Sequence, residues 1–82
     1  MNTDDKNKLR SFLQRALESH GDRRPLAGGD SLFVSSRLDS LSMMTLIVYL
    51  EESFGINFAE VDFDVDRIDT LDDIEAFVDA SQ

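Results

Sequence analysis

Residues 38–55 have the sequence LDSLSMMTLIVYLEESFG, which predicts a single helix over residues 40–54. Asp39 is the expected N-cap, because its carboxylate can accept hydrogen bonds from the unpaired N–H groups of the first turn. Gly55 is the expected C-terminal stop. At about 100° per residue, one arc of this helix collects the side chains that we expect to face the core: Met43, Leu46, Ile47, Leu50 and Phe54.

The same helix has a second apolar stripe, Leu41, Met44 and Val48, centred roughly 140° away from the first. A helix that is apolar on two sides is either fully buried or offers one side to a partner. Full burial is difficult in a small bundle, which favours a docking surface at this second stripe, with Glu51 and Glu52 below it. The alternative is that the loop before the helix covers the stripe.

An amphipathic helix is also expected over residues 4–20, because apolar residues recur there at helical spacing, with Thr3 as its N-cap. Residues 21–39 hold three of the four glycines and the only proline, so they are expected to form a long loop. Leu32 and Phe33 are expected to fix the later half of this loop to the core.

A last helix is expected over residues 71–80, where Thr70 and Asp73 have the spacing of a capping box. Before it, residues 61–66 alternate apolar and acidic side chains, a pattern typical of a strand, but no second strand is visible to pair with them. We therefore expect an extended segment that becomes a short helix near residues 66–68.

The 82 residues predict one domain, residues 1–82, which is too short for a catalytic domain with its own substrate cleft. The predicted fold class is all-α, a small four-helix bundle with three main helices and one short helix. The absence of cysteine excludes disulfides and Cys-based metal sites. No stretch approaches the roughly 20 apolar residues that span a bilayer, and no signal peptide is recognisable, so a cytoplasmic location is expected.

The charge of the chain indicates its partners. The net charge is −9, and it divides into +2 over residues 1–29 and −11 over residues 30–82. Nucleic acid and anionic lipid would be repelled, so we expect neither as a partner. Basic protein surfaces are favoured, although acidic residues can also serve solubility alone.

Ser40 begins the 40–54 helix. A hydroxyl in the first turn lies beside unsatisfied backbone N–H groups and the positive end of the helix dipole. This position suits a phosphate attached to the serine. The simpler interpretation is a serine that only assists capping.

These features together resemble the acyl carrier protein family over nearly the whole chain. Leu38-Asp39-Ser40-Leu41 matches the family's Asp-Ser-Leu motif, whose serine carries 4′-phosphopantetheine. Three further segments are similar to the family's loop before the attachment site, the end of its second helix and the start of its last helix: residues 30–33, 50–56 and 68–74. Asp-Ser-Leu occurs twice, but the spacing to these segments favours Ser40 over Ser31.

The resemblance implies a carrier and not an enzyme. A separate phosphopantetheinyl transferase would move 4′-phosphopantetheine from coenzyme A onto Ser40, and the thiol of this arm would hold an acyl or aminoacyl group as a thioester. The partners implied are acyl- or aminoacyl-activating ligases and synthases with basic docking surfaces, in fatty-acid-like or specialised biosynthesis. Asp39 and Leu41 would flank the attachment site, and partners would bind the second stripe together with Glu51 and Glu52. A monomer is expected.

The sequence departs from the family at two places. The family usually has glycine three or four residues before the serine, where this chain has Ser35-Ser36-Arg37, so the loop is expected to be less flexible or differently placed. Fatty-acid carriers usually have an acidic first half of the second helix, whereas residues 42–45 carry no charge. This difference favours a specialised pathway with an aminoacyl or unusual acyl cargo.

Three alternatives compete with the carrier. One is a hydrolase in which His20 and an aspartate activate Ser40, although His20 better suits the dipole at the end of the first helix. Another is an acidic docking module without cofactor that uses the second stripe. The third is a calcium loop, which is suggested by four spaced acids, Asp62, Asp64, Asp66 and Asp73. Arg67 occupies the position of this loop that needs glycine, so only nonspecific binding of divalent cations is expected.

Overall fold

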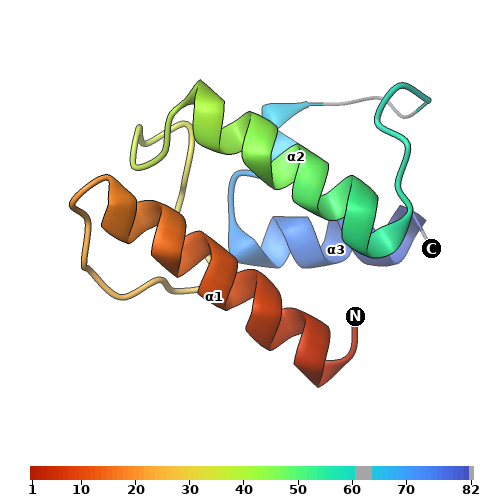
Figure 1. Cartoon of the computed structure of the whole chain (residues 1–82), viewed down its shortest axis with the longest axis horizontal. Helices are drawn as coiled ribbons and strands as arrows, with labels where there is room; N and C mark the ends of the chain where they lie inside the picture. Colours follow the sequence, from red (N-terminus) through yellow and green to blue (C-terminus); the bar gives the residue numbers. More distant parts are fainter. Residues whose placement is uncertain (61–63, 82) are drawn as a thin grey trace.

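Three α-helices and one short 3₁₀ helix make up the computed structural model, which describes residues 1–60 and 64–81 (Figure 1). The helices are α1 (Thr3–Ser19), α2 (Ser40–Phe54), η1 (Val65–Arg67) and α3 (Leu71–Ser81). The described part of the chain contains no strand, so the all-α class predicted from the sequence is confirmed. Residues 61–63, in the alternating segment, lie outside the described residues.

Helix α1 begins one residue earlier than the sequence predicts, and its N-cap is Asn2. The Asp5 backbone N–H donates to Asn2 Oδ1 over 2.8 Å. The prediction of Thr3 as the cap is therefore wrong, because asparagine is at least as good an N-cap as threonine and the helix extends to meet it. After Ser19 the chain turns at Gly21, whose φ of 78° is left-handed.

Both predicted ends of α2 are confirmed. The Ser42 backbone N–H donates to Asp39 Oδ1 over 2.9 Å, and Gly55 adopts the left-handed conformation with φ 68°. At the start of α3, the Asp73 backbone N–H donates to Thr70 Oγ1 over 3.0 Å. Asp39 and Thr70 satisfy N–H groups that the helices leave unpaired and fix where α2 and α3 begin, whereas Gly55 ends α2.

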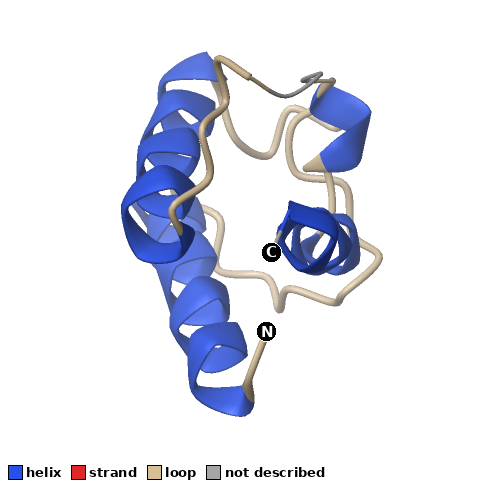
Figure 2. Ribbon diagram, turned by 90° about the vertical axis from the view of Figure 1, so that its right-hand side faces the viewer, coloured by secondary structure: helices blue, strands red, loops and turns tan. Residues whose placement is uncertain are grey.

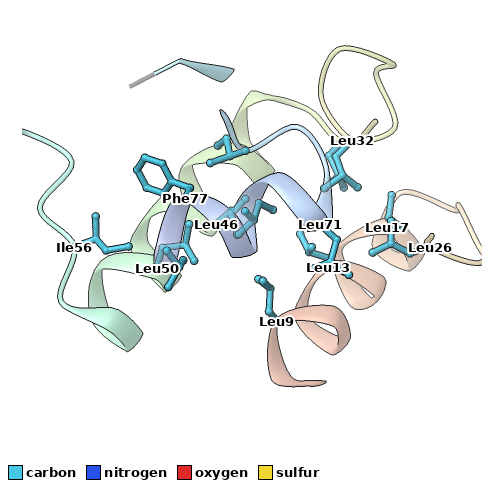
Figure 3. Close-up of a cluster of buried hydrophobic side chains, with 14 residues drawn as sticks. Leu9, Leu13, Leu17, Leu26, Leu32, Leu46, Leu50, Ile56, Leu71 and Phe77 are labelled. Atoms are coloured by element: carbon cyan, nitrogen blue, oxygen red, sulfur yellow. The ribbon is translucent and has the colours of Figure 1, made fainter. Parts of the chain in front are cut away.

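The core is built mainly of leucine (Figure 3). Each α-helix buries one face, and the 20–39 loop adds three leucines of its own, including Leu32, so the expected fixing of this loop is confirmed. Met43, Phe33 and Phe54 are half-buried against the same cluster. The buried apolar residues are Leu9, Leu13, Leu17, Leu26, Leu32, Leu38, Leu46, Leu50, Ile56, Ile68, Leu71, Ile74, Phe77 and Val78.

Helices α1 and α2 lie side by side and run in opposite directions, while Figure 2 shows α3 nearly end-on and apart from that pair. The rings of Phe12 and Tyr49 stack between α1 and α2 with centroids 4.6 Å apart. Because the pair is antiparallel, the C-terminal end of α1 lies beside the N-terminal end of α2. Residues from three segments, the end of α1, the loop and the start of α2, therefore meet around Ser40.

Candidate attachment site

Ser40 is the first residue of α2, and its side chain is exposed. Among the described residues its hydroxyl makes no hydrogen bond. The N–H groups of the first helical turn and the positive end of the dipole lie next to it, a setting that favours an attached phosphate. A shallow hollow of about 280 Å³ lies at the head of α2 and is lined by Phe33, Ser36, Leu38, Asp39, Ser40 and Met43.

Asp39 precedes the candidate serine and carries a charge at neutral pH. The backbone N–H of Ser42 is the main cause of the lowered pKa of the Asp39 carboxyl; the Ser42 hydroxyl and His20 add to this effect and together outweigh partial burial. The ionised carboxylate keeps its capping bond to Ser42 throughout the neutral range. The start of α2 therefore stays fixed while the Ser40 hydroxyl remains available.

His20 joins the end of α1 to the head of α2, a contact that the sequence does not reveal. Its Nε2 atom lies 3.0 Å from Ser42 Oγ and 3.8 Å from Asp39 Oδ1. His20 is also the C-cap of α1, in keeping with its expected place at the helix end. The serine that it contacts is Ser42, so the hydrogen bond that a Ser–His hydrolase needs is not made by Ser40 in this arrangement.

The first copy of Asp-Ser-Leu has a structural role. Ser31 Oγ donates to Asp69 Oδ2 over 2.5 Å, and the backbone N–H groups of Phe33 and Val34 donate to Asp69 Oδ1 over 2.7 and 2.9 Å. The Leu32 N–H donates to the Asp69 carbonyl over 2.7 Å. We call this group of contacts the Asp69 clamp. It occupies the Ser31 hydroxyl and ties the loop before Ser40 to the start of α3.

Asp69 is the one buried charged side chain among the described residues, with 9% of its surface exposed. Burial alone would raise the pKa of its carboxyl. The hydrogen bonds to the carboxylate from the Ser31 hydroxyl and from the backbone N–H groups of Val34 and Phe33 outweigh burial, with a smaller contribution from the nearby Leu32 N–H, so the pKa is lowered. The clamp therefore contains an ionised carboxylate that accepts three hydrogen bonds, which makes it strongly dependent on each donor.

Arg37 fixes the two halves of the loop to each other. Its Nε donates to Asp22 Oδ2 over 2.9 Å, its Nη1 lies 3.5 Å from Asp30 Oδ2, and its side chain is only 10% exposed. Asp22 also pairs with Arg24 over 2.8 Å. The guanidinium groups of Arg24 and Arg37 hold the pKa of the Asp22 carboxyl well below its usual range. Sequence reasoning did not identify this network, because ion pairs across a loop have no periodic signal.

Ser36, four residues before Ser40, has the backbone conformation that glycine adopts most easily. Its φ is 65°, the one left-handed value at a non-glycine position among the described residues. An L-residue is strained in this region because Cβ approaches a carbonyl oxygen. The resemblance to carriers places a glycine three or four residues before the serine, so the chain keeps a glycine-like turn here without the glycine.

Replacing Ser36 by glycine is expected to stabilise the fold by about 0.5–1 kcal/mol, because relief of left-handed strain exceeds the added freedom of the unfolded chain. Ser36→Val should cost about 1–2 kcal/mol, since a β-branched residue tolerates this φ poorly. Urea unfolding of the two variants measures both changes. Equal stabilities for Ser36→Gly and Ser36→Val would show that the turn is not strained.

The second stripe is exposed, so the loop does not cover it. Leu41, Met44 and Val48 are 72%, 64% and 49% exposed, and Glu51 and Glu52 are exposed further along α2. On the loop before α2, Val34 is a fourth large apolar side chain at the surface, which the sequence did not single out because it belongs to no helical stripe. The head of α2 is thus bordered by apolar surface.

The calcium-loop hypothesis rests partly on Asp62, which lies outside the described residues. Within the described ranges, no group of three or more His, Cys, Asp or Glu side chains could hold a metal ion. Asp64 instead caps η1, since its Oδ1 accepts from the Asp66 N–H over 3.0 Å.

None of the described helices is both long enough and apolar enough to cross a membrane.

The family model for phosphopantetheine attachment sites matches residues 7–78, nearly the whole chain. An exposed, unbonded serine at a helix N-terminus fits this group, so fold and site together define a carrier domain that bears covalently attached 4′-phosphopantetheine. The chain belongs to the phosphopantetheine attachment site family. Such carriers are generally non-catalytic and work with a phosphopantetheinyl transferase and partner enzymes. No curated protein and no solved structure matches the chain significantly.

Proposed function

We propose that Ser40 is the attachment residue and that the protein carries acyl or aminoacyl groups as thioesters. The supporting observation is the difference between the two Asp-Ser-Leu copies. The Ser40 hydroxyl is exposed and unbonded at the start of α2, whereas the Ser31 hydroxyl is bound in the Asp69 clamp. A transferase can reach the first without breaking any contact, but it would have to open the clamp to reach the second.

Attachment joins Ser40 Oγ to the pantetheine-side phosphorus of coenzyme A. The hydroxyl loses its proton, the pyrophosphate bond breaks and adenosine 3′,5′-bisphosphate leaves. The arm supplies the thiol that a chain without cysteine lacks. The protein's own contribution is positional: the N–H groups and dipole at the head of α2 favour the new phosphodiester charge, and Asp39 keeps that helical end in place.

Partner enzymes are proposed to bind the second stripe. Three exposed apolar side chains on one face of α2, followed by Glu51 and Glu52, fit a surface that is apolar at its centre and basic at its edge. The partners are an acyl- or aminoacyl-activating ligase and a synthase, besides the transferase.

The uncharged residues 42–45 favour a specialised pathway over bulk fatty-acid synthesis. A cytoplasmic location stays a prediction.

The experiment that tests attachment is the intact mass of the protein after incubation with coenzyme A, magnesium and a broad-specificity phosphopantetheinyl transferase. We expect the wild-type chain to gain one 4′-phosphopantetheine. The absence of a gain with several transferases would contradict the carrier proposal and favour a docking module without cofactor.

Met44→Glu is expected to lower kcat/KM for this loading reaction by about tenfold or more, since losing one central apolar anchor and burying a charge costs over 1 kcal/mol at an interface. Unfolding should be unchanged, because Met44 is exposed. Ala80→Glu, which adds the same charge at an exposed position on α3, is the matched control and should load normally. Equal loading of both variants would contradict docking at the second stripe.

A further inference from the structure

A groove of about 760 Å³ lies between α1 and α2, on the side of α2 away from the small hollow at Ser40. This volume falls within the range of small-molecule sites, about 300–1,000 Å³. Its apolar part includes the stacked rings of Phe12 and Tyr49, with Ala16 from α1 and Leu41 from α2. Phe12, Ala16 and Tyr49 also pack against the edge of the core, and Leu41 belongs to the second stripe, but neither role accounts for the open volume between the two helices.

The charge of the groove is opposite to that of the chain. In a protein of net charge −9, the groove is lined by Lys8 and Arg15, with Asp4 as the acidic member of the lining. Neither Lys8 nor Arg15 forms an ion pair with another described residue. Two unpaired cations beside aromatic and aliphatic side chains fit an amphiphilic ligand with an apolar body and an anionic end.

The groove also reaches the head of α2. Its lining includes Leu41, Ser42 and His20, so it opens one residue away from Ser40. Along α1, Arg15 lies about 8 Å and Lys8 about 18 Å from His20, at 1.5 Å of rise per residue. A flexible arm attached to Ser40 spans several turns of α1, so its cargo comes close to these cations when the arm bends back and the acyl group passes over the exposed Leu41 side chain into the groove.

We infer that this groove binds the acyl group of a dicarboxylic acid. One end of this cargo is the thioester, and the free carboxylate at its other end pairs with Arg15 or Lys8. The inference rests on the proposed attachment at Ser40. A fatty acyl chain without the second carboxylate would leave both cations unused. An aminoacyl cargo would bring its ammonium group toward two positive charges.

The test compares two cargoes of equal length. The transferase loads Ser40 from octanoyl- or suberyl-coenzyme A, which both have eight-carbon acyl chains and differ only in the terminal carboxylate. Intact mass verifies loading, and NMR of ¹⁵N-labelled protein reports amide shifts of Phe12, Ala16, Thr45 and Tyr49. A ¹³C label on the suberyl carboxylate reports its pKa. The variants are Arg15→Gln and Lys8→Gln, with Arg23→Gln as the control in the loop.

We expect suberyl loading to shift the groove amides about two- to fivefold more than octanoyl loading, the population ratio that one exposed ion pair supports. The carboxylate pKa should lie lower in wild type and Arg23→Gln than in Arg15→Gln or Lys8→Gln, since a nearby cation favours the charged form. Two results would overturn this inference and leave the attachment proposal intact. In the first, both cargoes shift the groove amides equally. In the second, the shifts are confined to the small hollow at Ser40. A failure to gain mass overturns the attachment proposal and this inference with it.

Discussion

Ser40→Ala is expected to abolish the gain of phosphopantetheine without changing stability, and Ser31→Ala is expected to do the reverse. The Ser40 hydroxyl is exposed and unbonded, so its loss should alter the free energy of unfolding by less than about 0.5 kcal/mol. Ser31→Ala removes a donor to the buried Asp69 carboxylate and should cost about 1.5–3 kcal/mol. Intact mass after the transferase reaction and urea unfolding measure the two effects.

Ser42→Ala is the third member of this series, because Ser42 is the nearest other serine at the head of α2. It should remain competent for loading, and it removes the side-chain contact with His20. If Ser31→Ala lost the gain in mass and Ser40→Ala kept it, the assignment of the two Asp-Ser-Leu copies would be reversed.

The largest loss of stability is expected for Asp69→Ala. The change leaves the Ser31 hydroxyl and the Phe33 and Val34 N–H groups without their acceptor. Each unsatisfied donor costs about 1–3 kcal/mol when buried, and partial hydration of the loop reduces the sum to about 3 kcal/mol. For a domain of this size the Tm should fall by more than about 10 °C. Circular dichroism during heating measures it.

Asp69→Asn tests whether the charge itself contributes. The folded-state pKa of Asp69 is lowered, so its ionisation stabilises the fold above the unfolded-state pKa, and this stabilisation is lost as pH falls through the folded-state value. Asp69→Asn should therefore be less stable than wild type near pH 7 and approach it on acidification below about pH 4. A constant difference in unfolding free energy between these two proteins from neutral to acidic pH would show that ionisation of Asp69 contributes nothing.

Much of α2 could be predicted from the sequence because its information is local. Apolar spacing identified both faces of the helix, although Ile47, which was expected on the core face, lies outside the core cluster. Asp39 and Gly55 identified the ends of the helix. The exposure of the second stripe followed from a simple argument, since a small bundle cannot bury two sides of one helix. The cap of α1 was misassigned because Asn2 and Thr3 are adjacent residues of similar capping ability.

The Asp69 clamp and the Arg37 network could not be predicted, because their members are distant in sequence. Asp69 and Ser31 are 38 residues apart, and Arg37 and Asp22 are 15 apart. No periodic pattern links such pairs. These contacts explain why the loop before Ser40 is fixed without the family's glycine. The groove between α1 and α2 was missed for a similar reason, because it depends on how two amphipathic helices pack and not on either one alone.

Peptide mapping of the loaded protein tests the central proposal most directly. Trypsin cleaves after Arg23 and Arg37 but not before Pro25, so it places Ser31 in residues 24–37 and Ser40 in residues 38–67. We predict one phosphopantetheine on the 38–67 peptide of wild type, assigned to Ser40 by fragmentation, and none in Ser40→Ala. A modified 24–37 peptide, or modification that persists in Ser40→Ala, would contradict the assignment of Ser40.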